Sequence, residues 1–101
     1  MTNLTYTSLK TSGSLNLSLY GNLIHIDGLR LYQDILERLD NVNNVIIDLA
    51  HLNRIDLTGL NALMVCQCHL SGANIDLKIK LGQNRQLKEL MQTTSVTQYL
   101  L

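Results

Sequence analysis

The chain has 101 residues, of which 46% are apolar, so it is long enough for one domain with a modest core and too short for two. Eight Lys and Arg residues balance eight Asp and Glu residues. Because there is no basic run, neither a nucleic-acid-binding surface nor a polybasic membrane patch is expected. No window approaches the roughly 18 apolar residues of a membrane helix, and residues 1–10 lack the apolar segment of a signal peptide. We therefore expect a single cytoplasmic domain over residues 1–101 that neither binds nucleic acid nor inserts into a membrane.

Two strands are expected in the first part of the chain, over residues 4–9 and 15–20. In the second, leucine alternates with polar residues, which is typical of a strand with one buried and one solvated face. Residues 11–14, Thr-Ser-Gly-Ser, predict the turn between the strands. Gly21 is expected to end the second strand.

The middle of the chain predicts a helix and then a buried strand. Apolar residues recur at helical spacing over residues 28–40, and Asp27 is suited to the N-cap position. The Asn-rich residues 41–44 should end this helix. Residues 45–49, Val-Ile-Ile-Asp-Leu, form a short apolar run that is typical of a central strand covered on both faces. A loop is expected over residues 50–55.

The last part of the chain continues this alternation. A helix is expected from Asp56 to Leu70, with Gly72 in the left-handed position that follows it. Apolar residues alternate over residues 75–81 and predict a strand, and Asn84 can cap a last helix. Residues 95–101 are expected to form a short packed turn.

Strands that alternate with helices need crossover connections, which favour parallel pairing in the later part of the sheet. The predicted fold class is therefore α/β, with an open mixed β-sheet covered by helices in a single domain.

One segment carries a recognisable pattern. Residues 44–72 hold a strand ending near an Asp, a polar loop, and a helix that opens with Asp-Leu-Thr-Gly-Leu at residues 56–60. This order resembles the central segment of STAS domains, the family of anti-sigma-factor antagonists, where the helix opens with Asp-Ser-Ser/Thr-Gly-Leu. The resemblance continues at Gly21–Leu23, where the family carries Gly-Glu-Leu, and at Leu87–Val96, which is similar to the family's Leu-Leu-x-x-Thr-Gly-Leu ending. It implies a STAS-like fold.

The resemblance also implies a function. In the family, the first hydroxyl residue of the motif accepts phosphate from a partner serine kinase. Here that position is Leu57, and the neighbouring hydroxyl is kept as Thr58. The implied role is a non-enzymatic regulator in signal transduction and transcription regulation that binds an anti-sigma factor or serine kinase. The implied partner-binding residues are Asp56, Leu57, Thr58, Gly59 and Leu60.

The missing hydroxyl changes what this motif can do. A helix N-terminus stabilises a phosphate in its first turn, because unpaired N–H groups and about half a positive charge lie there. A phosphate would add nearly two negative charges and repel a partner that fits the bare surface. Leu57 cannot carry one, so binding at this residue should escape the kinase. Thr58 is either a phosphoacceptor or bonded to its local backbone, and Asp56 is an N-cap that also borders the docking surface.

A second interpretation uses the same motif. Short STAS-like proteins with Asp-Thr-Gly-Gly at this turn serve as cytosolic accessory subunits of ABC-type lipid transporters. Leu57 departs from that pattern too. The choice between sigma-factor regulation and transporter assembly stays open, as does homodimer formation.

Other chemistry has weaker support in the sequence. Asp48, His51 and Asp56 are close enough along the chain to suggest a metal site. However, metal sites normally need three or four ligands and the chain has no His pair at ligand spacing, and Asp48 is more simply a cap or a carboxylate that fixes its loop. Cys66 and Cys68 would point about 200° apart on a helix, too far round to form a disulfide. No Gly-x-Ser-x-Gly or phosphate-cradling loop is present. We expect no cofactor, no metal and no enzymatic activity.

The predicted helix after Asp56 is apolar on more than one face. A single stripe facing the sheet explains about half of its apolar residues. The remainder could pack on a neighbouring helix or form an exposed patch for a partner.

Overall fold

A computed structural model describes residues 4–24 and 26–92. Its elements in chain order are β1 (Leu4–Thr11), β2 (Ser14–Leu23), α1 (Asp27–Glu37), β3 (Asn44–Asp48), β4 (Leu52–Ile55), α2 (Leu57–Gly72), β5 (Asp76–Lys80) and α3 (Arg85–Gln92). The expected order is confirmed, with β4 as an additional strand where a loop was predicted. The turn predicted over residues 95–101 lies outside the described residues.

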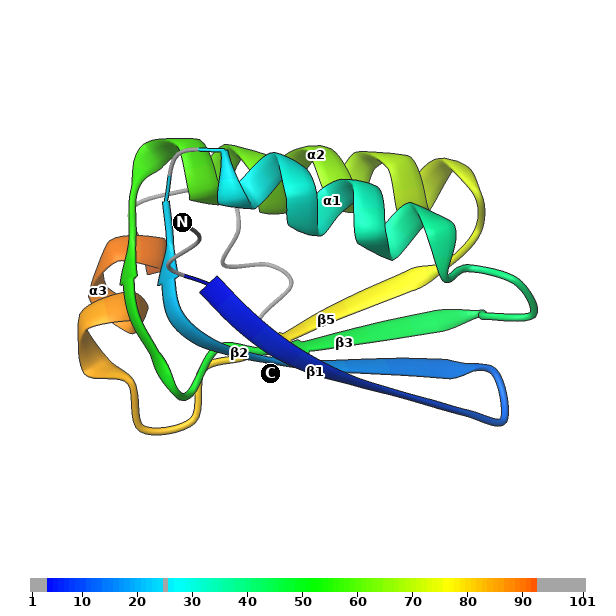
Figure 1. Cartoon of the computed structure of the whole chain (residues 1–101), viewed down its shortest axis with the longest axis horizontal. Coiled ribbons are helices and arrows are strands. Elements are labelled where there is room, and N and C mark those ends of the chain that lie inside the picture. Colours follow the sequence, from blue (N-terminus) through cyan, green and yellow to red (C-terminus); the bar gives the residue numbers. More distant parts are fainter. Residues whose placement is uncertain (1–3, 25, 93–101) are drawn as a thin grey trace.

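The strands form one mixed sheet in the order β1-β2-β3-β5, with β4 attached to β2 (Figure 1). Only the first pair, β1 and β2, is antiparallel. The pairs β2–β3, β2–β4 and β3–β5 are parallel, as the alternation of strands and helices predicts. The α/β class and the open mixed sheet are therefore confirmed.

Besides β1, the strand β2 pairs with two further strands, one after the other along its length. Residues 14–18 pair with β3, and residues 21–23 pair with β4. Gly21, at φ +89°, was predicted to end the strand, but the strand continues to Leu23. The register shifts between Gly21 and Asn22, and such a bulge bends a strand. Figure 1 shows the resulting curve, which carries the end of β2 toward the helices.

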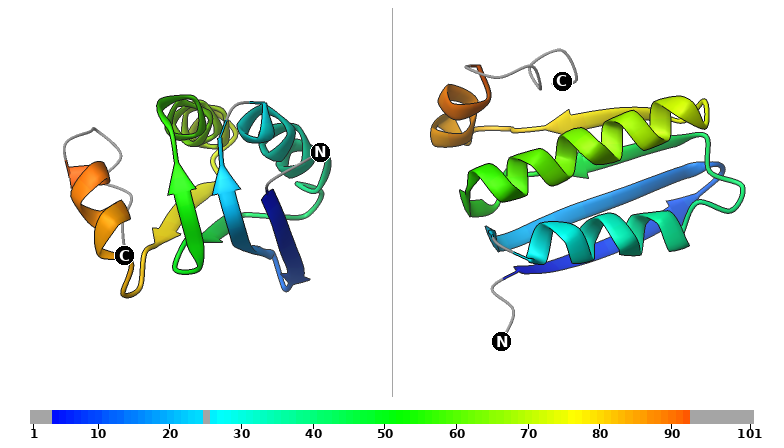
Figure 2. Two further views of the ribbon diagram at one scale, coloured as in Figure 1. Left: turned by 60° about the vertical axis from the view of Figure 1, so that its left-hand side comes forward. Right: turned by 90° about the horizontal axis from the view of Figure 1, so that it is seen from above.

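Both long helices, α1 and α2, lie side by side on one face of the sheet (Figures 1 and 2). Alternate strand residues point into the core beneath them, for example Val45 and Ile47, which are fully buried. Between them Ile46 is only half-buried. The prediction that β3 is covered on both faces is therefore wrong, because the described helices cover one face only.

The start of the first helix differs from the prediction. Asp27 is the first residue of α1 rather than its N-cap, which is Ile26 with no capping side chain. Asp27 is buried, in the first turn where a carboxylate is favoured by the helix dipole. The helix ends at Glu37, before the predicted residue 40.

The end of α2 is closed by Asn74 rather than by Gly72. Gly72 is the last helical residue, and Asn74 is left-handed at φ 61°. The Asn74 N–H donates to Ser71 O at 3.1 Å, and the Ile75 N–H donates to Leu70 O at 2.8 Å. This pair of bonds is the Schellman motif, in which Asn sometimes replaces Gly.

The cap predicted for the last helix is confirmed. The Leu87 N–H donates to Asn84 Oδ1 at 3.4 Å, at the start of α3. Among the helices of residues 4–24 and 26–92, none is long and apolar enough to cross a membrane.

Candidate docking surface

The helix α2 starts where the motif predicts, and Asp56 is its N-cap. The Gly59 N–H donates to Asp56 Oδ1 at 2.8 Å, which satisfies one of the open N–H groups of the first turn. The Asp56 N–H in turn donates to Leu23 O at 3.3 Å. The first bond caps α2, and the second ties the start of α2 to the end of β2.

Two of the five predicted partner-binding residues face inward. Gly59 and Leu60 are both buried. A Cβ atom on Gly59 would lie 2.2 Å from the carbonyl oxygen of Leu23, which is closer than any non-bonded contact. The expectation that Gly59 and Leu60 touch a partner is corrected: their burial assigns them to packing α2 on β2.

The other residues of the motif are accessible. Leu57 is 71% exposed, Thr58 is exposed and Asp56 is half-buried. Leu57 is the first residue of α2, so its side chain lies at the positive end of the helix. An apolar side chain this exposed gains little from burial in the fold.

A close approach of the two helices extends the surface around Thr58. A Cβ atom on Gly28 of α1 would lie 2.9 Å from the Ala62 Cβ atom of α2 and 3.3 Å from the Gly59 Cα atom. Because glycine lets the backbones come this near, the first turns of α1 and α2 lie together.

The approach leaves a shallow apolar groove of about 220 Å³ between the helices, which we call the α1–α2 groove. Its lining residues are Leu29, Tyr32, Thr58, Asn61, Ala62 and Val65. Leu29 and Val65 are each 51% exposed, and Ile26, just before α1, is 58% exposed.

The α1–α2 groove carries no carboxylate, ammonium or guanidinium group among its lining residues. The first turn of α2 contains no acidic residue either. A contact from Tyr32 to His69 also joins the two helices: the Tyr32 hydroxyl lies 3.3 Å from His69 Nδ1. The surface therefore suits an uncharged partner group.

Sequence patterns found only part of this surface. Leu57 and Thr58 follow from the motif, and Val65 belongs to the apolar surplus noted on the second helix. Leu29 is one of the apolar residues at helical spacing over residues 28–40, and the structure exposes it. No sequence pattern pointed to Ile26, because its exposure depends on how Gly28 places α1.

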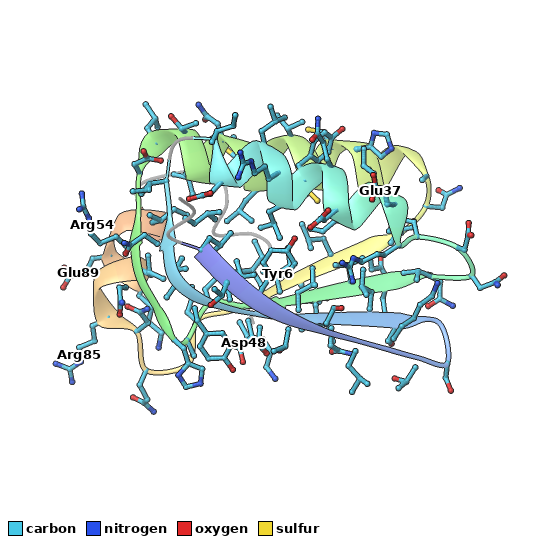
Figure 3. The ribbon with its side chains drawn as sticks, viewed as in Figure 1. Tyr6, Glu37, Asp48, Arg54, Arg85 and Glu89 are labelled. Atoms are coloured by element: carbon cyan, nitrogen blue, oxygen red, sulfur yellow. The ribbon has the colours of Figure 1, made fainter. Side chains whose placement is uncertain are left out.

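The residues considered for a metal site are not brought together. Asp48 Oδ1 accepts the Ala50 N–H at 2.9 Å, so this carboxylate fixes its loop. The His51 ring stacks on Tyr20 with centroids 5.4 Å apart. Figure 3 shows Asp48 on the sheet face away from the helices, whereas Asp56 caps α2. Within the described ranges, no group of three or more His, Cys, Asp or Glu side chains is arranged to hold a metal ion.

The two cysteines lie in different environments. Both belong to α2; Cys66 is buried and Cys68 is exposed, and both thiols are free. Burial raises the pKa of the Cys66 thiol from 9.0 to about 12. Cys66 is therefore a packed, protonated core residue near neutral pH.

No protein-family model matches the sequence, and no curated protein matches it. The likeness lies in the fold. The anti-sigma-factor antagonist SpoIIAA in its unphosphorylated form superposes with a TM-score of 0.82 at 13% identity, over 96% of this chain and 86% of that one. The Bacillus cell fate determinant SpoIIAA in its phosphorylated form gives a TM-score of 0.76 at 13% identity, over 96% of this chain and 89% of that one.

An anti-sigma factor antagonist from Mycobacterium paratuberculosis gives a TM-score of 0.66 at 19% identity, covering 91% of this chain and 83% of that one. The murine Solute Carrier 26 family member A9 anion transporter gives 0.75 at 12% identity; the match covers 91% of this chain but only 16% of the transporter. The chain therefore has the STAS fold of the anti-sigma-factor antagonists.

Proposed function

We propose that this domain is a non-enzymatic regulator that docks an anti-sigma factor or a serine kinase through the start of α2. The observation that carries the proposal is the 71% exposure of Leu57 at the first position of α2. It is supported by the neighbouring α1–α2 groove, whose lining is free of charged groups.

The contact surface that we propose consists of Leu57 and Thr58 with the exposed apolar residues Ile26, Leu29 and Val65. Contiguous exposed apolar patches mark protein interaction sites, whereas singly scattered exposed apolar residues are ordinary. Leu57 would act as an anchor that enters a pocket on the partner. Asp56 stabilises this surface by capping the helix.

The same arrangement has a regulatory consequence. SpoIIAA is known in phosphorylated and unphosphorylated forms, but leucine has no hydroxyl to accept a phosphate. We propose that binding through Leu57 is constitutive with respect to that residue. Thr58 remains accessible to a kinase, and its phosphorylation would place a dianion in the otherwise uncharged groove.

The test is a calorimetric titration of the protein with the anti-sigma factors and serine kinases encoded in its own genome. The Leu57→Glu variant should bind its partner at least about 30-fold more weakly, the effect of losing an interface anchor worth roughly 2 kcal/mol. Folding should be unaffected, because Leu57 is exposed and an acidic residue is favoured at a helix start.

The matched control is Leu9→Glu. Leu9 is also a leucine and is 63% exposed, but β1 places it opposite Asn16, on the face of the sheet away from the helices. Equal weakening by the two variants would argue against docking at α2. Binding to a transporter permease and ATPase, with no affinity for the anti-sigma factor or kinase, would replace the proposal with the transporter-subunit interpretation.

A further inference from the structure

The strand β5 lies at one margin of the described sheet, opposite β1 (Figure 2). In the part of the chain that the structure describes, β5 pairs with β3 alone. An open groove of about 490 Å³ lies between the end of α2 and the start of β5, lined by Gln67, Ser71 and residues 74–78. The described residues therefore leave room for a further strand beside β5.

The pairing with β3 shows which backbone groups of β5 point outward. The Asp76 N–H donates to Asn43 O at 3.1 Å, just before β3, so Asp76 directs its backbone groups toward that strand. Successive residues of a strand direct these groups to opposite sides. Leu77 and Ile79 therefore direct their N–H and C=O groups toward the outer edge, where another strand can bond to them.

The exposed face of β5 carries charges of both signs. Asp76, Lys78 and Lys80 are exposed, whereas Leu77 and Ile79, which alternate with them, are buried. Like charges directly opposite each other destabilise a strand pair, and opposite charges stabilise it. Because Asp76 and Lys78 are neighbours on one face, the strand is complementary to a second copy of itself that runs the opposite way.

We propose that the protein forms a homodimer in which β5 pairs antiparallel with β5 of a second copy, about a two-fold axis at Leu77. Asp76 of each copy then lies opposite Lys78 of the other, on the exposed face of the sheet. The two Leu77 residues lie opposite each other and exchange both backbone hydrogen bonds, as outward-directed residues of an antiparallel pair do. The contact is isologous and closes on itself.

Charge selects this register over its neighbours. An axis at Asp76 would bring two carboxylates together, and an axis at Lys78 would bring two ammonium groups together. An axis at Ile79 would place Lys78 opposite Lys80. Each of these registers sets like charges directly opposite each other. A shift by one residue would instead place the apolar residues of one copy opposite charged residues of the other. Only the axis at Leu77 joins opposite charges and keeps the apolar residues together.

The same complementarity selects a second copy as the occupant. The other edge strand, β1, has a single charged residue, Lys10, so it offers no such reciprocal pair to β5 or to itself. Apolar residues also match in the proposed register, because Ile75 lies opposite Ile79 of the second copy. The Ile75 N–H is used within the chain, where it donates to Leu70 O at 2.8 Å. Its carbonyl points to the outer edge and accepts the Ile79 N–H of the second copy.

The test is the mass of the whole protein in solution, measured by sedimentation equilibrium over a wide concentration range. The wild type should approach twice the chain mass of 11.4 kDa. Lys78→Asp places carboxylates opposite each other and should weaken the dimer by at least about tenfold. Lys10→Asp is the matched control, with the same charge reversal on an exposed residue of β1, and should leave the dimer unchanged.

A second pair of variants tests the register. Asp76→Lys should weaken the dimer as Lys78→Asp does, because lysines then lie opposite each other. The double variant Asp76→Lys with Lys78→Asp should restore it, because each lysine again meets a carboxylate. Both residues are exposed, so the variants should fold, and circular dichroism checks this.

A wild type that stays at 11.4 kDa throughout would overturn the proposal. So would a dimer that Lys78→Asp leaves intact, or one that the double variant fails to restore. Equal weakening by Lys10→Asp, or a dimer that only Leu57→Glu disrupts, would place the interface on β1 or on the helix face and contradict pairing at β5.

Discussion

Among single residues, Gly59 shows that the glycine of the motif can be explained by internal packing, without reference to a partner. The start of α2 lies so close to the end of β2 that a Cβ atom at this position would be 2.2 Å from a backbone oxygen. A backbone atom cannot move aside as a flexible side chain can. The glycine therefore fixes where α2 begins, and so where Leu57 is presented.

Gly59→Ala should destabilise the fold by about 2–3 kcal/mol, the upper part of the range of roughly 1–3 kcal/mol for overpacking a core. Gly72→Ala is the matched control, because Gly72 is also helical but has nothing within 4 Å of the added Cβ atom. That control should gain up to about 1 kcal/mol from helix propensity. Urea unfolding measures both values, and similar results for the two variants would contradict the packing role of Gly59.

The two thiols should differ in their reactivity toward a thiol reagent. Near neutral pH, a thiol reagent should modify only Cys68 in the native protein, because Cys66 is buried and its pKa is raised to about 12. Unfolding should release the second thiol. Labelling followed by mass measurement tests this, and Cys66→Ser and Cys68→Ser identify which thiol reacts. Rapid modification of both thiols in the folded protein would show that α2 opens readily.

The raised pKa of Cys66 also gives a sign for stability at high pH. The folded protein retains this proton more tightly than the unfolded chain, so the stabilising contribution is complete below pH 9.0 and is lost as the pH rises toward about 12. Cys66→Ala should reduce this loss. A midpoint of urea unfolding that falls equally in both proteins over that range would assign the effect to other groups.

At the scale of elements, Asn84 joins three parts of the chain. Its amide nitrogen donates to Leu49 O at 3.2 Å and to Leu52 O at 2.8 Å, on either side of the β3–β4 connection. Its amide oxygen accepts from Leu87 N at the start of α3. One side chain thus holds the loop that leads into β4.

Asn84→Ala should cost about 2–3 kcal/mol, because two partly buried carbonyls and one helix cap lose their partner. Asn84→Asp keeps the cap but loses both donors, so it should lose part or all of the stability that Asn84→Ala loses. Asn53→Ala, in the neighbouring strand β4 and exposed, is the control and should change little. Thermal unfolding measures all three, and an Asn84→Ala variant as stable as the control would contradict the linking role.

The elements that the sequence predicted are those with a local signal. Alternating leucines identify β2, and the capping Asp56 with the apolar run behind it identifies α2. The strand β4 has no such signal, since its four residues show no alternation in burial and its pairing depends on the bend at Gly21. Long-range contacts of this kind cannot be derived from local pattern.

The candidate site likewise has a part that the sequence predicts and a part that it does not. Leu57 and Thr58 follow from the motif alone. The α1–α2 groove does not, because it exists only where Gly28 lets the first turns of both helices approach Ala62. Spacing places Leu29 on the apolar side of α1 but cannot tell a core position from a groove position.

Across the whole molecule, the two faces of the sheet differ. The helices α1 and α2 cover one face, and the exposed Leu57 and the α1–α2 groove lie on that side. Asp48 lies on the other face.

Docking through Leu57 without control by a kinase is tested most directly by the affinity for the partner, measured before and after incubation with the serine kinase and ATP. Wild type should retain its affinity and its mass. Leu57→Ser, which restores the hydroxyl that the family carries, should gain the mass of one phosphate and lose binding. A wild-type protein that gains a phosphate on Thr58 and releases its partner would contradict constitutive docking.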